Sequence, residues 1–413
     1  MSAVPATSLL RSPRCLFLGV VCVGLLAFLL WPQVSARLGF LDRGMWFVDS
    51  YALLAASDAQ RAGIDFSERN PLDVYHRPHS YSSWWLALGA IGLTGEDNFL
   101  LGGLAVLGFV LSFLAWWRPD NRAEAVGAAL LLLSPPCLLA INRANNDLFV
   151  AALLAAGVMG LTRATPARLG MFGLAVVLAT GLKFYPLVAA VGLLAVGSPR
   201  WRWLAFGLTL AAAGGVLATE WEWFRRAVIP VPDGLYLYGS AILWRELGFT
   251  GGLVLPVSVV LLAMAGAVLA WRRTTAGLAD EVAPLAERVA FLAGAAMLAA
   301  CWLLGISYAY RWILALLLVP WCWRRARAGD EAARLAIGLL AVGLWGDGLF
   351  CLVTNTFVGA MPVPRLEAVQ HVWQLSVQPL LWCWHALLAG WGVDLLVART
   401  LGWSRLRRPE AGS

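Results

Sequence analysis

The chain has 413 residues, of which 60% are hydrophobic and only 13% charged, and it contains 22 tryptophans. Soluble globular domains carry about 25% charged residues, so this composition excludes an ordinary water-soluble protein. The formal net charge of +7 comes with arginines that cluster between apolar blocks. That pattern is typical of the loops that orient a membrane protein, not of a nucleic-acid-binding surface. We therefore predict an integral membrane protein that contacts membrane lipids and binds no nucleic acid.

Apolar blocks recur along the chain at about the length that spans a bilayer. The first, at 15–34, is interpreted as an uncleaved span whose N-terminus lies inside. A short apolar piece at 82–93 is interpreted as an interfacial or half-inserted helix. The remaining spans are expected near 98–117, 124–141, 146–162, 169–182, 185–198, 202–219, 252–271, 289–306, 311–323, 334–353 and 376–398.

Twelve spans with both termini in the cytoplasm satisfy the positive-inside rule. They place these arginine clusters on the cytoplasmic side: Arg118 and Arg122, Arg163 and Arg168, Arg200 and Arg202, Arg272 and Arg273, Arg324, Arg325 and Arg327, and the tail with Arg399, Arg405, Arg407 and Arg408. The expected fold is therefore an all-α polytopic membrane protein of about twelve transmembrane helices. Its large first extracytoplasmic loop contains an amphipathic helix. We interpret residues 1–413 as a single domain with a first outer loop and interfacial helices (35–97), a core array of spans (98–325), and C-terminal spans with a basic tail (326–413).

The first outer loop holds most of the polar chemistry of the N-terminal third. Asp49 and Ser50 open a helix-like run that stops at Gly63, which is typical of a capped amphipathic helix lying on the membrane. Asp49 is interpreted as the cap of this helix, as a catalytic base, or as both. Asp58 is interpreted as a solvated residue that pairs with Arg61.

Cysteines and histidines give little sign of a metal site. The seven cysteines form no CxxC pair, so neither a disulfide framework nor a zinc site is indicated. His76 and His79 stand three residues apart, but Pro78 lies between them and no third ligand is evident. We expect no metal and no cofactor. The tryptophans at the ends of spans are interpreted as anchors in the membrane interface.

Polar residues at the outer ends of the predicted spans carry the functional signal. Ser134, Pro135 and Pro136 break one span, and irregular backbone at membrane depth is tolerated where it is buried or lines a wet cavity. Lys183 is the only lysine, and as an outward cation it opposes the positive-inside trend, which favours contact with an anion. Candidate substrate-binding residues in a cationic, aromatic-rimmed pocket are Arg143, Asn145, Asn146, Asp147, Lys183, Tyr185, Tyr308, Tyr310 and Arg311.

Each of these charged residues also has a purely structural interpretation. Lys183 could extend its ammonium to the lipid headgroups, and Arg311 could anchor an aromatic belt. Arg143 and Asp147, four residues apart, could form an ion pair on one helix.

The order of these segments resembles a known family. An Asp-bearing outer loop (VDSYALLA), a polar break (NRANNDLF), a lysine turn (GLKFYPL) and a late turn (SYAYRW) are similar to the multi-spanning C-type membrane glycosyltransferases that use polyprenyl-phosphate sugars. The closest branch contains the actinobacterial phosphatidylinositol-mannoside mannosyltransferases. The resemblance covers most of residues 44–325 and implies that Asp49 is the catalytic base. It also implies a bacterial plasma membrane location.

The chemistry agrees with that resemblance. Transfer from a lipid-phosphate sugar needs a base for the acceptor hydroxyl and cations for the departing phosphate. We therefore expect a glycosyltransferase that moves a hexose, with mannose as one option, from a polyprenyl-phosphate donor to a lipid or glycan acceptor outside the cytoplasm. A transporter or flippase of a lipid-linked sugar is the alternative, and a non-catalytic subunit of an envelope-glycan assembly is a third interpretation.

Overall fold

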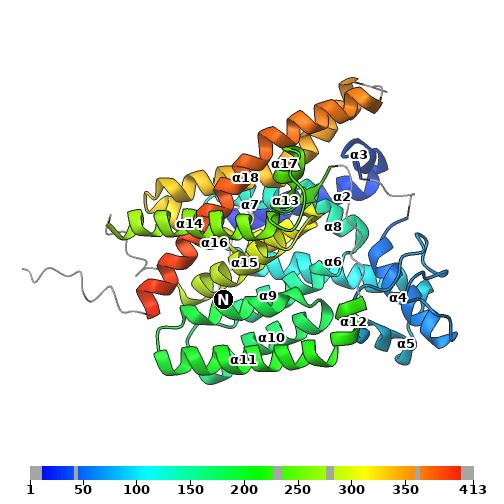
Figure 1. The fold of residues 1–413 in the computed structure, drawn as a ribbon, viewed down its shortest axis with the longest axis horizontal. Coiled ribbons are helices and arrows are strands. Elements are labelled where there is room, and N and C mark those ends of the chain that lie inside the picture. Colours follow the sequence, from blue (N-terminus) through cyan, green and yellow to red (C-terminus); the bar gives the residue numbers. More distant parts are fainter. Residues whose placement is uncertain (1–11, 41–44, 227–234, 276–282, 359–362, 401–413) are drawn as a thin grey trace, which may run out of the picture.

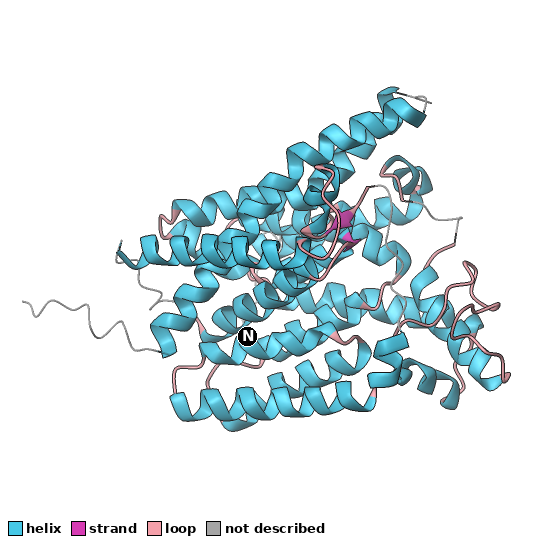
Figure 2. Ribbon diagram, in the orientation of Figure 1, coloured by secondary structure: helices cyan, strands magenta, loops and turns pink. Residues whose placement is uncertain are grey.

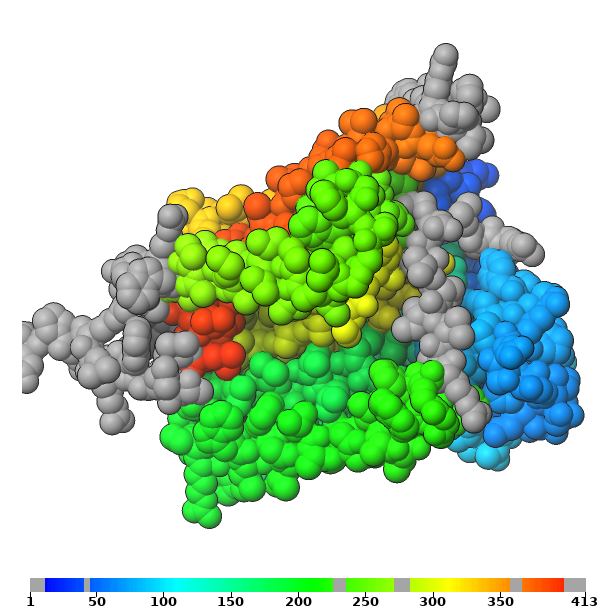
Figure 3. All heavy atoms as spheres, viewed as in Figure 1, coloured from blue at the N-terminus to red at the C-terminus, as the bar shows by residue number. Residues whose placement is uncertain are grey.

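The computed structural model describes residues 12–40, 45–226, 235–275, 283–358 and 363–400. Within these residues the fold is all-α except for one pair of two-residue strands (Figure 2). Figure 1 shows long helices that run beside one another, with the short helices α4, α5 and α12 gathered at one end. The segment that carries α4 and α5 projects from this end of the molecular surface (Figure 3).

The elements are given below in chain order; η marks a 3-10 helix, except for the π-helical η5. The first half contains α2 (Pro13–Leu30), α3 (Pro32–Arg37), α4 (Val48–Arg61), η1 (Ser83–Leu86), α5 (Ala87–Ala90), η2 (Gly95–Asp97), α6 (Asn98–Trp116), α7 (Arg122–Leu132), α8 (Pro135–Arg143), α9 (Asp147–Met159), α10 (Pro166–Leu182) and η3 (Tyr185–Ala195). The second half contains α11 (Pro199–Thr219), α12 (Trp221–Arg226), β1 (Leu237–Tyr238), α13 (Ala241–Glu246), α14 (Val254–Thr275), α15 (Leu285–Leu303), β2 (Ser307–Tyr308), η4 (Ala309–Leu317), α16 (Val319–Arg327), α17 (Glu331–Val353), η5 (Thr354–Val358) and α18 (Val363–Thr400).

Five helical segments among the described residues are long and apolar enough to cross a bilayer. They are Pro13–Leu30, Gly95–Trp116, Pro199–Thr219, Leu285–Leu303 and Glu331–Thr356. Helices α7 and α8 meet at a bend of 48°. Together they add a sixth candidate segment if the pair is counted as one broken span. These segments make the chain a multi-pass membrane protein with five or six candidate spans.

Several of the other predicted spans fold as shorter helices. The segment predicted at 146–162 is the 13-residue α9, and the one at 185–198 is the 11-residue 3-10 helix η3. The segment predicted at 311–323 is divided between η4 and α16. The total of twelve spans, and the side of the membrane that each loop faces, stay predictions.

Helix α4 follows the predicted run but begins one residue earlier. It ends where Gly63, at φ 68°, donates its N–H to the carbonyl of Gln60. Its apolar face, with Leu53 and Leu54 fully buried, packs against η1, α5 and α6. The helix is therefore held by the protein itself, and its first turn is fixed in position relative to the bundle.

The interpretation of the tryptophans at the ends of predicted spans as interface anchors is wrong for Trp302 and Trp312, which lie in a buried aromatic group. Trp302, Trp312 and Trp384 are at most 1% exposed. The Trp302 ring stacks on the His385 imidazole with 4.1 Å between ring centroids, and Trp312 and Trp384 lie 4.9 Å apart. Aromatic rings gain from such close offset and edge contacts beyond their burial. They therefore form a core that joins α15, η4 and α18.

The strand pair positions the last polar segment. β1 and β2 are antiparallel, with Leu237 opposite Tyr308, and the N–H of Ala309 donates to the carbonyl of Tyr236 at 2.7 Å. Asp347 of α17 accepts a hydrogen bond from the N–H of Tyr236 at 3.1 Å. These contacts fix the start of η4, from which Tyr310 and Arg311 extend.

Candidate functional site

The break between α8 and α9 brings three polar side chains together. Pro135 begins α8 after the extended Ser134, and the helix ends at Arg143. Ala144 then adopts a left-handed conformation with φ 43°, which is uncommon for a residue with a Cβ. The side chain of Asn145 closes the turn by accepting the N–H of Asp147 at 3.0 Å. This tight reversal lets both helix ends contribute to one site.

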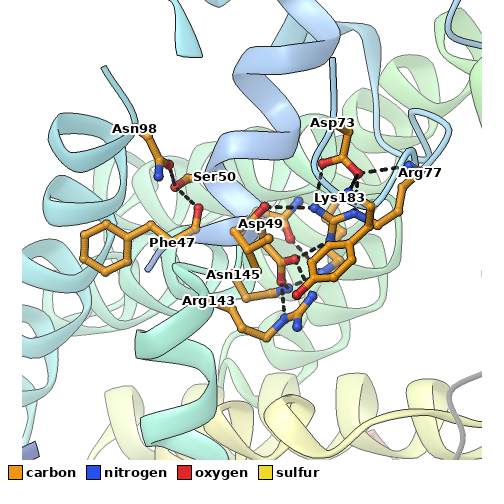
Figure 4. A network of polar contacts seen from close by, with 12 residues as sticks. Phe47, Asp49, Ser50, Asp73, Arg77, Asn98, Arg143, Asn145 and Lys183 are labelled. Atoms are coloured by element: carbon orange, nitrogen blue, oxygen red, sulfur yellow. Dashed lines mark hydrogen bonds and ion pairs between the residues drawn. The ribbon is translucent and has the colours of Figure 1, made fainter. Parts of the chain in front are cut away.

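Asp49, in the first turn of α4, lies at the centre of the first half of the site (Figure 4). Arg143 donates to both of its oxygens, from Nη2 to Oδ1 at 2.7 Å and from Nε to Oδ2 at 3.0 Å. Asn145 Nδ2 donates to Oδ2 at 2.7 Å, and Arg77 Nη1 donates to Oδ1 at 2.8 Å. Each carboxylate oxygen therefore accepts two hydrogen bonds, and the Asp49 side chain is only 6% exposed.

Arg77 bridges Asp49 to the rest of the loop between α4 and η1. Its Nε and Nη2 donate to the two oxygens of Asp73, both at 2.9 Å, and Nη2 also donates to the carbonyl of Val48 at 2.9 Å. Asp73 is 2% exposed, so the loop places a second buried carboxylate next to the first.

The second half of the site is built around Asp147, which has no exposed surface. Lys183 Nζ lies 2.6 Å from Oδ1, and Arg311 Nη1 donates to both oxygens at 2.9 and 2.8 Å. The hydroxyl of Tyr185 donates to Oδ1 at 2.9 Å. Lys183 also donates to Asn146 Oδ1 at 2.7 Å. The α9 N-terminus, the lysine turn and η4 are thus joined through one carboxylate.

Tyrosine rings surround the cations of both halves. Lys183 Nζ lies 5.7 Å from the Tyr310 ring centroid, and the Arg311 guanidinium carbon lies 4.5 Å from that of Tyr185. The guanidinium of Arg143 lies 5.7 Å from the Tyr308 ring, which itself stacks on Tyr310 at 5.4 Å. Cations near aromatic faces gain electrostatic stabilisation, more so where water is excluded. The rings therefore help to hold several positive charges close together.

The lysine turn is itself clamped by the segment around η1. Ser82 Oγ donates to the carbonyl of Gly181, and Trp85 Nε1 donates to the carbonyl of Leu182 at 2.9 Å. The ring of Trp84 lies against Gly181 so closely that a Cβ there would be 2.2 Å from it. A glycine is needed at this position because the indole occupies the space of any side chain.

We expect Gly181→Ala to destabilise the protein by about 1–3 kcal/mol, because the added methyl group overpacks the contact with Trp84. Thermal unfolding of the purified protein in detergent measures this effect. Gly170 is the matched control, since a Cβ there meets nothing within 4 Å and Gly170→Ala should be neutral or stabilising. Equal melting temperatures for Gly181→Ala and wild type would contradict the clamp.

The charges around Asp49 decide its protonation. Burial by itself raises the pKa of this carboxyl, but the positive charges of Arg143 and Arg77 and their hydrogen bonds outweigh burial. The pKa therefore lies well below its usual range, and Asp49 is ionised at any physiological pH. In the site as a whole, four cations (Arg77, Arg143, Lys183, Arg311) face three carboxylates (Asp49, Asp73, Asp147).

His79 lies beside the site as a buried neutral group. Phe66, Tyr81 and Trp223 surround its ring, and Nε2 lies 3.1 Å from the carbonyl oxygen of Ser82, to which it donates. Burial lowers the pKa of His79 to about 4. Since the unfolded chain binds this proton at about pH 6.5, folding releases it at intermediate pH.

Acidification is therefore expected to destabilise the loop between α4 and η1. The contribution of neutral His79 to the free energy of unfolding is fully present above about pH 6.5 and is lost as the pH drops toward 4. Between pH 7 and pH 5 the free energy of unfolding should fall by about 2 kcal/mol. Melting temperatures at the two pH values measure it. His79→Gln should lose this part of the pH dependence, whereas His76→Gln, at an exposed position, should keep it. Equal pH dependence in both variants would contradict the assignment.

The structure brings all ten predicted site residues into this single cluster, while their roles in binding and catalysis stay predictions. The predicted pair of Asp58 with Arg61 is confirmed. Other interpretations are corrected. Asp49 does not cap α4, because its N-cap is Phe47 and its carboxylate faces the arginines. The alternative interpretation of Arg143 and Asp147 as an ion pair on one helix is wrong, since each has a distant partner.

The anchor interpretations of Lys183 and Arg311 are wrong as well. Lys183 is 9% exposed and the side chain of Arg311 15% exposed, and both bind Asp147 instead of reaching toward headgroups. Arg77 and Asp73 are two further residues of the cluster that were not predicted from the sequence. Arg77 carried only a partial signal, because it is one of several arginines, among them Arg61 and Arg69, in the same predicted outer loop as Asp49.

A cavity of about 550 Å³ lies away from this cluster, at the ends of α6, α9 and α16 and the start of α15. Its charged lining includes Arg324, which pairs with Glu287 at 2.6 Å. Between the polar cluster and this cavity, α9 carries a series of fully buried apolar residues: Leu148, Ala151, Leu154, Ala155 and Val158.

Comparison of the chain with protein-family models, with curated proteins and with solved structures finds no match.

Proposed function

We propose that this protein is an integral membrane glycosyltransferase. In this proposal it transfers a hexose, with mannose as the first candidate, from a polyprenyl-phosphate donor to a lipid or glycan acceptor. The reaction takes place on the extracytoplasmic face of a bacterial plasma membrane, in a topology of about twelve spans with both termini inside. The observation that carries the proposal is a buried cluster in which cations outnumber carboxylates around one ionised aspartate.

The excess positive charge supports an anionic substrate. Uncompensated charge in a poorly solvated place is unfavourable, so a cluster with one surplus cation favours a bound anion. Two donors in the cluster, Asn146 Nδ2 and Arg311 Nε, are buried and have no acceptor among the described residues. A phosphate oxygen or a sugar hydroxyl would supply the missing acceptor.

The neighbouring carboxylate supports group transfer. The departing polyprenyl phosphate is stabilised by cations, so the remaining requirement is a base that accepts the proton of the attacking acceptor hydroxyl. Asp49 is ionised and lies 2.7 Å from Arg143, so one side chain that could receive the phosphate also orients the base. No covalent nucleophile is needed for a single displacement at the anomeric carbon.

A transporter or flippase of a lipid-linked sugar is the second candidate, because the same cations could hold a phosphate in transit. The charged cavity at the far ends of α6 and α9 is the observation that favours it. The apolar series along α9 that separates this cavity from the cluster favours the transferase instead. A transport path would need polar groups along that distance.

The deciding experiment incubates purified protein with polyprenyl-phosphate mannose or polyprenyl-phosphate glucose and with extracted envelope lipids. We expect a lipid or glycan whose mass increases by one hexose, together with free polyprenyl phosphate. The same donors in sealed proteoliposomes test the alternative. Movement of intact donor between leaflets without any hexosylated product would contradict the transferase proposal.

A further inference from the structure

Asp49 cannot act as a base in the arrangement that the structure describes. Its two oxygens together accept four hydrogen bonds, two on each oxygen, and the side chain is almost fully buried. A carboxylate oxygen offers about two acceptor sites, so an acceptor hydroxyl finds none unoccupied. One of the three donor residues must therefore leave Asp49 before it can receive a proton.

Arg77 is the donor that can leave most easily. Arg143 makes two bonds to Asp49 from the end of α8, and Asn145 is fully buried in the turn that follows. Arg77 makes one bond, comes from the loop between α4 and η1, and is the most exposed of the three, with 24% of its side chain accessible.

The remaining contacts of Arg77 keep it in place when this one bond breaks. Nε and Nη2 bind Asp73, and Nη2 also binds the carbonyl of Val48, so only Nη1 reaches Asp49. A guanidinium held by a fork on one carboxylate needs only a small rotation to present Nη1 to a different acceptor.

We propose that Arg77 is a latch that couples donor binding to activation of Asp49. When the phosphate of the donor enters the cluster, Arg77 Nη1 exchanges Asp49 Oδ1 for a phosphate oxygen. The freed Oδ1 then accepts the hydrogen bond of the acceptor hydroxyl. This inference rests on the proposed function, and it assigns to Arg77 a role that neither Arg143 nor Lys183 can take. Asp49 is thereby kept inactive until the donor is bound.

The test is a double-mutant cycle on the binding of polyprenyl phosphate, the leaving group of the proposed reaction. Dissociation constants are measured for wild type, Arg77→Gln, Asp49→Asn and the double variant. In an exchange, Arg77 gives up one charged partner for another, so Arg77→Gln alone should change affinity by less than about threefold. With Asp49→Asn, Arg77 gives up only a neutral hydrogen bond on binding phosphate, and Arg77→Gln should then weaken binding by about tenfold to a hundredfold.

Other roles for Arg77 give different patterns. An ordinary phosphate contact would give the same large loss in both backgrounds, and a purely structural residue would give the same small change in both; either result overturns the latch. Arg61→Gln, an exposed arginine on α4 paired with Asp58, is the matched control and should bind like wild type. If wild type itself does not bind polyprenyl phosphate, the proposed function fails first, and the latch fails with it.

Folding of each variant is checked by gel filtration and thermal unfolding before binding is measured. Asp49→Ser provides a second neutral background if Asp49→Asn does not give folded protein, and the same two patterns are compared there.

Discussion

Asp147→Asn is expected to lower the free energy of unfolding by about 3–5 kcal/mol, the largest loss of stability for any single substitution in the site. The carboxylate has no exposed surface and neutralises Lys183 and Arg311 at distances of 2.6 and 2.8 Å. Asparagine keeps the size but leaves two buried cations facing each other without a counter-charge. Thermal or denaturant unfolding in detergent measures the loss.

A double variant distinguishes the effect of charge imbalance on stability from the effect of lost packing. Removing Lys183 together with Asp147 restores the original net charge of the cluster, so Asp147→Asn/Lys183→Met should recover a large part of the lost stability. Asp58→Asn is the surface control, because that carboxylate pairs with a half-exposed arginine and should lose no more than about 1 kcal/mol. Equal losses for Asp147→Asn and Asp58→Asn would mean that the buried ion cluster contributes little.

The gathering of the site residues could be predicted from the sequence because each polar segment interrupts an apolar block. The break at Asn145 and Asp147, the turn at Lys183 and the segment at Arg311 each end a predicted span on the same predicted face. Segments that share a face of a helical bundle lie at similar depth, so they have a good chance of meeting. Asp49 could be added to the predicted site because it follows the first predicted span.

The pairing within the cluster could not be predicted in this way. Arg143 has Asp147 four residues away, a spacing that favours a pair on one helix. Ala144 and the turn that follows end α8 instead, so Arg143 reaches Asp49, which lies 94 residues earlier in the chain. Which loop arginine would reach Asp49 was equally open, since Arg61, Arg69 and Arg77 all lie in the predicted outer loop.

The number of spans was harder to predict for a related reason. Hydropathy identifies an apolar block but not its backbone, and η3 and η4 are apolar blocks that fold as 3-10 helices of 11 and 9 residues. Helix η4 is almost entirely buried, with Ile313 and Leu316 fully enclosed, and η3 buries one face, on which Ala189 and Leu193 have no exposed surface. Such segments carry the composition of a span because they form the core between longer helices.

Asp49→Asn is expected to reduce hexose transfer by about two to four orders of magnitude, the effect typical of losing a general base. Asparagine keeps the shape of aspartate and can still accept a hydrogen bond from Arg143, but it cannot take the proton of an acceptor hydroxyl. Because residue 49 is buried next to two arginines, the loss of its charge also lowers the stability of the protein. Rates are therefore normalised to the amount of folded protein. Mass spectrometry of the hexosylated product measures the rate.

Asp58→Asn is the matched control, since this carboxylate lies on the same helix but faces away from the cluster and pairs with Arg61. We expect it to keep wild-type activity within about threefold, as surface substitutions usually do. Measurement of donor binding distinguishes the possible causes of lost activity in Asp49→Asn. A base variant loses product formation while it still binds polyprenyl phosphate, whereas a collapsed cluster loses both. Full activity in Asp49→Asn would show that Asp49 is not the base. The next side chain to test would then be Asp147, the buried carboxylate that binds Lys183 and Arg311.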